Sequence, residues 1–283
     1  MTYHRLETNE GERFYREMGD GEPIVLLHCG AGSSGAWLPV MEHLGQDYRV
    51  LAPDLLGYGR SAPWPREAVL APDAELGVVQ ALLNVAGRPS DRRVHLVGHS
   101  YGGAVALDAA RRFPGRIASL TLIEPVAFRL LRGANAPDGW REVVALADRH
   151  LALVGEGRDA EAAEAFTTYW VGRKGWVQMP DAARASAIRT APKVAAEWRL
   201  MLAAEDDPEP VTRIDAPTLL ICGGGTRRPV QQVVEVLLRM LTDARQHEIA
   251  DAGHMSPLTH PAAVAEAIRR HVEAVNARRR SAA

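Results

Sequence analysis

Gly98-His99-Ser100-Tyr101-Gly102-Gly103 is the stretch that decides the fold, because it joins an apolar run to an amphipathic one. The run before it, Val94-His95-Leu96-Val97-Gly98, is typical of a buried strand, and residues 101–113 have the pattern of a helix. A serine in so sharp a turn takes a strained backbone conformation, and glycines on both sides supply steric clearance. The turn lifts the Ser100 hydroxyl to a helix N-terminus, where developing negative charge is stabilised. The pattern predicts Ser100 as a nucleophile, against the alternative of a serine in a purely structural turn.

Short apolar runs alternate with amphipathic runs over most of the chain. Continuous apolar runs suit parallel strands that are buried on both faces, and they predict strands at residues 24–28, 49–53, 94–98, 117–123, 218–222 and 245–249. Amphipathic runs predict helices at residues 101–113, at 229–241 and from Pro261 onward. Residues 3–8 and 12–18 alternate apolar and polar side chains around Glu10-Gly11, as in a hairpin. The alternation predicts an α/β sheet with helices on both faces.

The segment from Phe128 to Pro210 breaks this alternation, since it contains no convincing buried strand. Its amphipathic runs predict helices at roughly residues 139–154, 159–172, 181–190 and 193–204. Seven of the 16 aromatic residues lie in this segment: Phe128, Trp140, Phe166, Tyr169, Trp170, Trp176 and Trp198. The pattern predicts a helical insertion between two strands of the sheet.

A serine hydroxyl is a poor nucleophile until a base removes its proton, and ten histidines are available for that role. His254 lies in a turn, Asp251-Ala252-Gly253-His254-Met255, after the last strand and before the last helix. His99 adjoins the serine, but alternation along a strand directs its side chain into the core. His28 is expected to orient the glycine-rich turn after it, and His260 to help begin the last helix. Position therefore favours His254 as the general base.

Four segments together resemble the α/β-hydrolase superfamily, and the resemblance covers essentially the whole chain. They are the loop from His28 to Gly35, residues 53–61 (Pro-Asp-Leu-Leu-Gly-Tyr-Gly-Arg-Ser), the serine turn, and Ala252-Gly253-His254. The resemblance implies a mostly parallel eight-stranded sheet, a lid domain inserted after the sixth strand, and a site with the chain order serine, acid, histidine. We expect an α/β-hydrolase core domain at residues 1–126 and 211–283, and a helical lid domain at residues 127–210.

The same resemblance implies an oxyanion hole made by two backbone N–H groups. In the family, one belongs to the residue after the nucleophile, here Tyr101. The other belongs to the residue that follows His-Gly after the third strand. The chain reads His28-Cys29-Gly30, so Gly30 is the matching donor, with Ala31 as a close alternative. Cys29 replaces the usual glycine and is expected to be a small packing residue, with a reactive thiol as the alternative.

The acid departs from the commonest pattern of the family. The family usually carries it in the loop after the seventh strand, but residues 223–229 of this chain contain no carboxylate, and Thr226 stands at about the expected position. The loop after the sixth strand contains Glu124, at a site that carries the acid in some members, including certain haloalkane dehalogenases. A carboxylate there can accept the histidine N–H and stabilise the imidazolium. We predict Glu124 as the acid. The alternative for Glu124 is a structural role at the lid entrance. Asp251 is nearer to His254 in sequence but is expected to stabilise its own turn.

Composition argues against several other classes of function. The 33 basic and 35 acidic side chains give a net charge of -2, so no overall field attracts nucleic acid or anionic lipid. No apolar run reaches the roughly 18 residues of a membrane span, and the first residues lack the apolar stretch of a signal peptide. The glycine-rich loop after His28 fits neither the dinucleotide fingerprint nor the P-loop. We expect a reduced cytoplasmic protein without metal or cofactor that acts on a small molecule. The sequence does not indicate its oligomeric state.

The sequence predicts a serine hydrolase that forms an acyl-enzyme on Ser100 and cleaves a small apolar or aromatic carboxylic ester, thioester or lactone. A serine at the turn, in place of aspartate, argues against haloalkane dehalogenase and epoxide hydrolase chemistry. Trp170, Trp140 and Phe128 are predicted to line an apolar substrate pocket, unless these aromatics form the lid's own core. A carbon–carbon bond hydrolase, a lyase or acyltransferase, and a non-catalytic ligand-binding protein remain alternatives.

Overall fold

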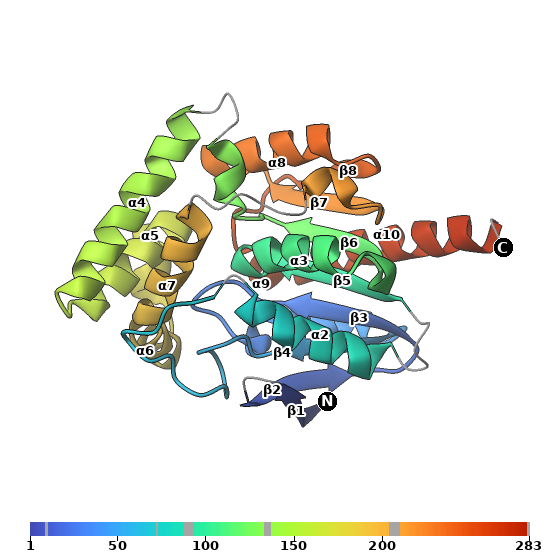
Figure 1. The fold of residues 1–283 in the computed structure, drawn as a ribbon, viewed down its shortest axis with the longest axis horizontal. Helices are drawn as coiled ribbons and strands as arrows, with labels where there is room; N and C mark the ends of the chain where they lie inside the picture. Colours follow the sequence, from blue (N-terminus) through green and yellow to red (C-terminus); the bar gives the residue numbers. More distant parts are fainter. Residues whose placement is uncertain (9–10, 72, 88–92, 133–136, 204–209, 282–283) are drawn as a thin grey trace.

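An eight-stranded sheet forms the centre of the computed structural model, which describes residues 1–8, 11–71, 73–87, 93–132, 137–203 and 210–281. Its strands are β1 (Thr2–Thr8), β2 (Gly11–Met18), β3 (Glu22–Leu27), β4 (Tyr48–Pro53), β5 (Val94–His99), β6 (Ile117–Ile123), β7 (Thr218–Gly223) and β8 (Ala244–Ile249). Their order is β1-β2-β4-β3-β5-β6-β7-β8; β2 is antiparallel to both neighbours, and β3 to β8 are parallel (Figure 1). The predicted mostly parallel eight-stranded sheet is confirmed, while the predicted hairpin turn at Glu10 lies outside the described residues.

Helices cover both faces of the sheet, because successive residues of each buried strand point to opposite sides. On one face of the sheet, Leu96 of β5 packs with α2 (Ala74–Ala86), α3 (Tyr101–Arg112) and α8 (Arg228–Met240). On the other face, Val97 of β5 packs with α1 (Leu38–Leu44) and α10 (Pro261–Ser281). The connections contain short helices: η1 (Ser34–Trp37), η2 (Pro114–Arg116), η3 (Phe128–Leu131), η4 (Val211–Arg213) and α9 (Ser256–Thr259). Of the longer helices, α1 and α2 were not predicted.

Between β6 and β7 the described residues form an insertion of four helices, which lie together at one end of the sheet (Figure 1). They are α4 (Pro137–Gly155), α5 (Asp159–Gln178), α6 (Asp181–Arg189) and α7 (Ala191–Leu202). The predicted insertion is confirmed, with one difference in α5. The prediction ended this helix at Gly172, where φ is 74° and the helix is kinked, but α5 continues beyond the kink to Gln178. No helix in the described part of the chain combines the length and the apolar character needed to cross a bilayer.

A buried ionic cluster, formed by Lys193, Glu75, Glu197 and Tyr58, joins the insertion to the core. Lys193 of α7 is fully buried, and its Nζ lies 3.0 Å from Glu75 Oε1 of α2 and 2.8 Å from Glu197 Oε1 of α7. The ammonium also lies over three aromatic rings, at 4.8, 5.1 and 5.4 Å from the ring centres of Tyr101, Tyr58 and Trp64. Burial disfavours the charged form, but the carboxylates of Glu197 and Glu75 raise the pKa of Lys193 above its ordinary value. The insertion is therefore held to the core by a lysine that stays charged.

The cluster predicts unequal effects for the chain's two lysines. Lys193→Met leaves two buried carboxylates without their cation, and breaking a buried pair in this way lowers the free energy of unfolding by about 3–5 kcal/mol. Lys174→Met is the matched control, because Lys174 is exposed on α5, and its effect should be below about 0.5 kcal/mol. Urea denaturation measures both variants. An unchanged midpoint for Lys193→Met would contradict a stabilising role for the cluster.

Candidate active site

The turn between β5 and α3 holds Ser100 in a strained backbone conformation, with φ 55° and ψ -116°. The chain turns so tightly that a Cβ at Gly98 would lie 2.2 Å from the carbonyl oxygen of Gly102. A Cβ at Gly102 would lie 2.3 Å from the carbonyl oxygen of Leu27 in β3. Both positions therefore require glycine, and the resulting turn sets Ser100 at the N-terminus of α3.

His254 lies in the turn after β8, within hydrogen-bond distance of the serine: its Nε2 is 2.9 Å from Ser100 Oγ. The neighbouring His99 holds this turn, because its Nε2 lies 2.7 Å from the His254 carbonyl oxygen. A carbonyl only accepts, so His99 Nε2 must donate. Burial lowers the pKa of His99 to about 3, which keeps the ring neutral. His99 is thus buried, as strand alternation predicts, and it also fixes the backbone of His254.

Glu124 follows β6 and continues this chain of contacts. Its Oε2 lies 3.3 Å from His254 Nδ1, which is longer than a typical charge-assisted hydrogen bond. Its Oε1 accepts from the Gly223 N–H at 2.8 Å and from the hydroxyl of Thr226. Thr226 stands where a carboxylate was expected after the seventh strand, and it contacts the carboxylate that comes from the sixth. The structure therefore brings Ser100, His254 and Glu124 into one connected group.

Backbone N–H groups of the loop after β3 (residues 28–32) and of the first residue of α3 lie beside the serine. No described residue accepts a hydrogen bond from the N–H of Gly30 or of Tyr101. The backbone of Ala31, the alternative donor, interacts with the Tyr58 hydroxyl. Of the two candidates in the loop, Gly30 is the one without this interaction.

His28 ties this loop to the loop after β4. Its Nδ1 donates to the Cys29 carbonyl oxygen at 2.8 Å, and its Nε2 accepts from the Leu55 N–H at 3.0 Å. Burial lowers the pKa of His28, which favours this neutral form. Burial also raises the pKa of the Cys29 and Cys222 thiols to about 12, so neither forms an appreciable thiolate near neutral pH. Among the described residues, no group of His, Cys, Asp and Glu side chains is arranged to hold a metal ion.

A cavity of about 460 Å³ opens beside Ser100 and His254. The loop after β3, helices α5 and α6, and the segment that follows His254 form its walls. The lining residues are Cys29, Gly30, Ala31, Gly32, Ser33, Ala36, Ser100, Phe166, Thr167, Trp170, Val171, Gly175, Met179, Pro180, Ala183, Ser186, Ala187, His254, Met255, Leu258 and Thr259. None of them is an aspartate, glutamate, lysine or arginine. The arrangement places a serine hydroxyl and an imidazole beside a largely apolar cavity.

Trp170 of α5 forms the wall of the cavity over the histidine. Its ring stacks on the His254 imidazole, with ring centres 3.8 Å apart and an angle of 20° between the planes. The indole Nε1 is buried and has no hydrogen-bond partner among the described residues. Phe166, four residues earlier on the same helix, also lines the cavity but was not singled out from the sequence. The spacing of Phe166 and Trp170 is the signal for it, since residues four apart share one face of a helix.

Phe128 and Trp140, the other aromatics predicted to line the pocket, lie away from this cavity. Phe128 is fully buried and stacks on Trp198, with ring centres 6.1 Å apart. Trp140 packs against the main core, and the Arg132 guanidinium lies 5.9 Å from its ring centre. Apolar residues at helical spacing pack against whichever neighbouring element covers them, so their sequence pattern is the same in a core and in a pocket. Phe128 and Trp140 therefore pack in or against the core, which was the alternative to a place in the substrate pocket.

Comparison with known proteins relates this architecture to one family. Residues 24–267 match the alpha/beta hydrolase family. The chain is 26% identical to 2-hydroxy-6-oxo-6-(2'-aminophenyl)hexa-2,4-dienoic acid hydrolase of Metapseudomonas resinovorans, over 88% of this chain and 83% of that protein. It is 33% identical to (lyso)-N-acylphosphatidylethanolamine lipase of Homo sapiens, over 46% of this chain and only 39% of that protein. The structure of an esterase from Thermogutta terrifontis superposes with a TM-score of 0.73 at 23% identity, over 97% of this chain and 99% of that chain.

The esterase superposition shows a common fold, and the two sequence relatives act on different kinds of molecule, so neither resolves a substrate. The family match extends from within β3 into α10 and includes the serine turn and the turn of His254. The expected resemblance is confirmed by this match and by the observed sheet. The chain belongs to the α/β-hydrolase family.

Proposed function

We propose that the protein is a serine hydrolase that cleaves a small, uncharged carboxylic ester through an acyl-enzyme on Ser100. The observation that carries this proposal is the connected group at the mouth of an apolar cavity. In it, Ser100 Oγ lies 2.9 Å from His254 Nε2, and His254 Nδ1 lies 3.3 Å from Glu124 Oε2. A nucleophile within reach of a base, with the base oriented by a third group, is the arrangement that acyl transfer requires.

The proposed reaction has two halves that use the same histidine. His254 Nε2 takes the proton of Ser100 as Oγ attacks the ester carbonyl, and Glu124 stabilises the imidazolium that forms. The imidazolium then protonates the leaving alcohol oxygen, and the acyl group remains on Ser100. In the second half, His254 removes a proton from water, which attacks the acyl carbon and releases the acid. Collapse of the second intermediate returns the proton to Ser100.

The oxyanion of both tetrahedral intermediates is proposed to bind the N–H groups of Gly30 and Tyr101. Neither group has an acceptor among the described residues, so both can bind the substrate oxygen without breaking an existing hydrogen bond. From here on we call residues 28–32 the oxyanion loop. The interaction of the Ala31 backbone with Tyr58 supports Gly30 as the donor from this loop.

The charge of the cavity wall favours an ester over the acid substrate of a relative. The Metapseudomonas resinovorans enzyme is named for a dienoic acid, and such a carboxylate is ionised at neutral pH. The described cavity lining contains no lysine or arginine to pair with it. Burying an unpaired carboxylate is costly, whereas an uncharged acyl or alcohol group gains from the apolar wall. We accordingly propose an ester with uncharged acyl and alcohol parts, with a thioester or lactone as variants of the same chemistry.

We also propose that residues 127–210 act as a lid on a core of residues 1–126 and 211–283. The part of this segment that supports the proposal is the pair of helices α5 and α6 with the link between them, which together supply ten of the 21 cavity-lining residues. Trp170 covers one face of the His254 ring from this side, so a lid in this position shields that face of the base from bulk water.

An ester series tests the function directly. Wild type is expected to release p-nitrophenol from neutral alkanoyl esters, while Ser100→Ala releases none above background. Mono-p-nitrophenyl succinate, whose acyl group ends in a carboxylate, should have a kcat/KM lower than the butyrate ester by about tenfold or more, because the cavity lacks a cation. Equal release by wild type and Ser100→Ala would remove Ser100 from the mechanism. A preference for the succinate ester would contradict the uncharged substrate.

The displaced acid has a separate test. Glu124→Gln preserves the shape of the side chain but accepts the His254 N–H without a negative charge, so kcat should fall by roughly 10²–10⁴-fold. Asp251→Asn is the matched control, because Asp251 is the carboxylate nearest in sequence to His254 yet is exposed. Its kcat should stay within about twofold of wild type. The reverse pattern, with the loss in Asp251→Asn, would make Asp251 the acid.

Trp170 is proposed to cover the base with its indole ring. Trp170→Phe keeps a ring over His254 and should retain kcat within about threefold, whereas Trp170→Leu removes the stacked ring and should lower kcat about tenfold, through loss of contact with the imidazolium. Trp140→Leu, at a tryptophan away from the cavity, is the control and should leave KM unchanged. Steady-state kinetics with one alkanoyl ester compare all three. A larger rise of KM in Trp140→Leu than in Trp170→Leu would contradict the assignment of the cavity.

A further inference from the structure

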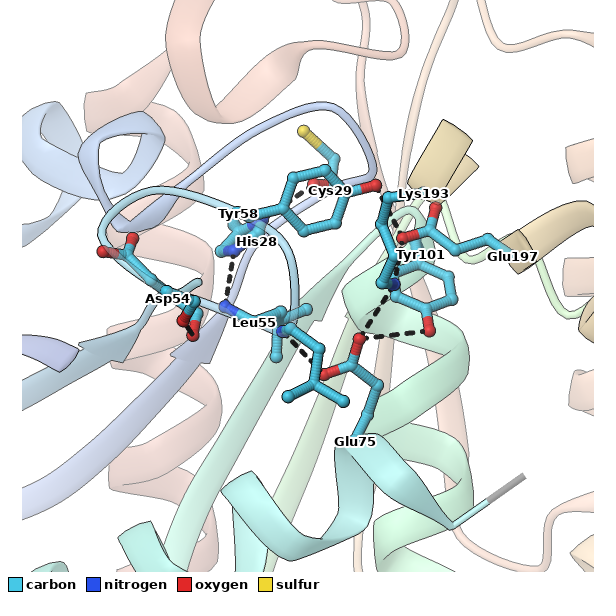
Figure 2. Close-up of polar contacts among 11 residues, drawn as sticks. His28, Cys29, Asp54, Leu55, Tyr58, Glu75, Tyr101, Lys193 and Glu197 are labelled. Carbon is cyan, nitrogen blue, oxygen red and sulfur yellow. Dashed lines mark hydrogen bonds and ion pairs between the residues drawn. The ribbon is translucent and has the colours of Figure 1, made fainter. Parts of the chain in front are cut away.

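The oxyanion loop lies against the ionic cluster that joins the insertion to the core (Figure 2). Glu197 Oε1 is the shared acceptor of this cluster, at 2.6 Å from the Tyr58 hydroxyl and 2.8 Å from Lys193 Nζ. Glu197 and Lys193 come from α7 of the insertion, while Tyr58 comes from the loop after β4. All three side chains are 0–1% exposed, so their contacts are not weakened by solvent.

Two members of the cluster touch the oxyanion loop itself. A Cβ at Gly30 would lie only 2.8 Å from Glu197 Oε2, so this carboxylate packs directly on the backbone of Gly30. The Tyr58 hydroxyl donates to Glu197 and also interacts with the backbone of Ala31. Ala31 has a φ of 55°, a conformation that a side chain-bearing residue keeps only when its surroundings enforce it. The cluster supplies that enforcement next to the proposed donor Gly30.

The same cluster also reaches Tyr101, the residue that bears the other proposed donor. Lys193 Nζ lies 4.8 Å from the centre of the Tyr101 ring. Glu75 Oε1, which is 3.0 Å from Lys193 Nζ, also accepts from the Tyr101 hydroxyl at 3.4 Å. A single set of buried charges therefore touches both sides of the proposed oxyanion hole (Figure 2).

Within the cluster, Glu75 has a cationic partner only when α7 is in place. One ammonium faces two carboxylates, and burial raises the pKa of Glu197 although Lys193 and Tyr58 oppose this. If α7 moved away, Glu75 would lose its cation and Tyr58 would lose its acceptor. The oxyanion loop would then lose the contacts at Gly30 and Ala31 that support its conformation.

We propose that Glu197, Lys193 and Tyr58 are positioning residues for the oxyanion hole, so that docking of α7 on the core assembles the hole as well as closing the cavity. The catalytic part of this inference rests on the proposed serine-hydrolase function. The positioning part rests on the contacts alone.

A second ion pair provides a control for general anchoring of the insertion. Arg66, in the loop after β4, pairs with Asp159 at the start of α5, with Arg66 Nη1 at 3.1 Å from Asp159 Oδ1. This pair also crosses from core to insertion, but it does not contact the oxyanion loop. Asp159→Asn therefore loosens the insertion without removing a support of Gly30 or Ala31.

The kinetic test compares Tyr58→Phe and Glu197→Gln with Asp159→Asn, each assayed well below the midpoint of its own cooperative thermal transition. Misplacing a transition-state donor should lower kcat by about 10–100-fold with KM within about twofold, because the ground-state ester does not depend on the hole. Affinity for an alkylboronic acid, which becomes tetrahedral on Ser100, should fall in parallel with kcat. Asp159→Asn should change neither. Equal loss in all three variants, or a loss confined to KM, would overturn the positioning role.

Hydrogen exchange provides a readout that does not need turnover. Peptides that contain the Ala31 amide should exchange at least about tenfold faster in Tyr58→Phe than in wild type, and no faster in Asp159→Asn. Unchanged exchange in Tyr58→Phe and Glu197→Gln would overturn the proposal even if kcat fell. A wild type that cleaves no ester would overturn the proposed function, while accelerated exchange in Tyr58→Phe would still support the positioning of the loop.

Discussion

The site depends on the close approach of the serine turn to the strand beside it. Gly102 packs on the carbonyl oxygen of Leu27 so closely that no side chain fits between them, which fixes α3 against the end of β3. On the other side, the Ser100 N–H donates to the Ile123 carbonyl oxygen at 2.9 Å, and the Ser100 carbonyl oxygen accepts from the Val126 N–H at 3.3 Å. The serine turn is thus tied to the ends of β3 and β6, the two strands that flank β5. Small changes in this packing would move Ser100 relative to His254 and Glu124, and displacements of about 1 Å are enough to impair the catalysis proposed for these residues.

Backbone strain in the described residues is concentrated at this site. Ala31, Ser100 and Glu124 are the non-glycine residues of the described chain that have positive φ, at 55°, 55° and 49°. Each such conformation costs about 1–3 kcal/mol and persists only where the surroundings enforce it. For Glu124 the surroundings are two hydrogen bonds, from its own N–H to the Ile221 carbonyl oxygen at 2.9 Å and from the Gly223 N–H to its carboxylate at 2.8 Å. The fold thus uses part of its stability to hold polar groups ready for a reaction.

Charge is distributed unevenly around the cavity. The carboxylate of Glu124 lies behind His254, and the ionic cluster lies behind the oxyanion loop, while the described cavity wall has no acidic or basic side chain except His254. Charges behind the reacting groups can orient them without competing for the substrate. The position of the acid illustrates the tolerance of a parallel sheet: β6 and β7 are neighbours and end at the same edge, so a carboxylate after either strand can reach the same histidine. Thr226 occupies the position after β7 where the family usually carries its acid, and its hydroxyl donates a hydrogen bond to the Glu124 carboxylate.

The sequence by itself determined the elements whose signals are local. The apolar runs, the glycines around Ser100 and the helical periods of the insertion specify backbone geometry within a few residues, so the sheet, the turn and the four inserted helices could be predicted. Ser100, His254 and Glu124 were singled out by their positions at strand ends, but their separation of 2.9 and 3.3 Å is a property of the folded chain. Lys193 and Glu197 look like an ordinary exposed pair four residues apart on a helix, and only the docking of α7 buries them beside the oxyanion loop. Phe128 and Trp140 have the same apolar spacing as Trp170, yet the core covers the first two and leaves the third in the cavity. The difference has one physical cause: periodicity tells which face of a helix is apolar, whereas the element that covers that face is decided by contacts between distant parts of the chain.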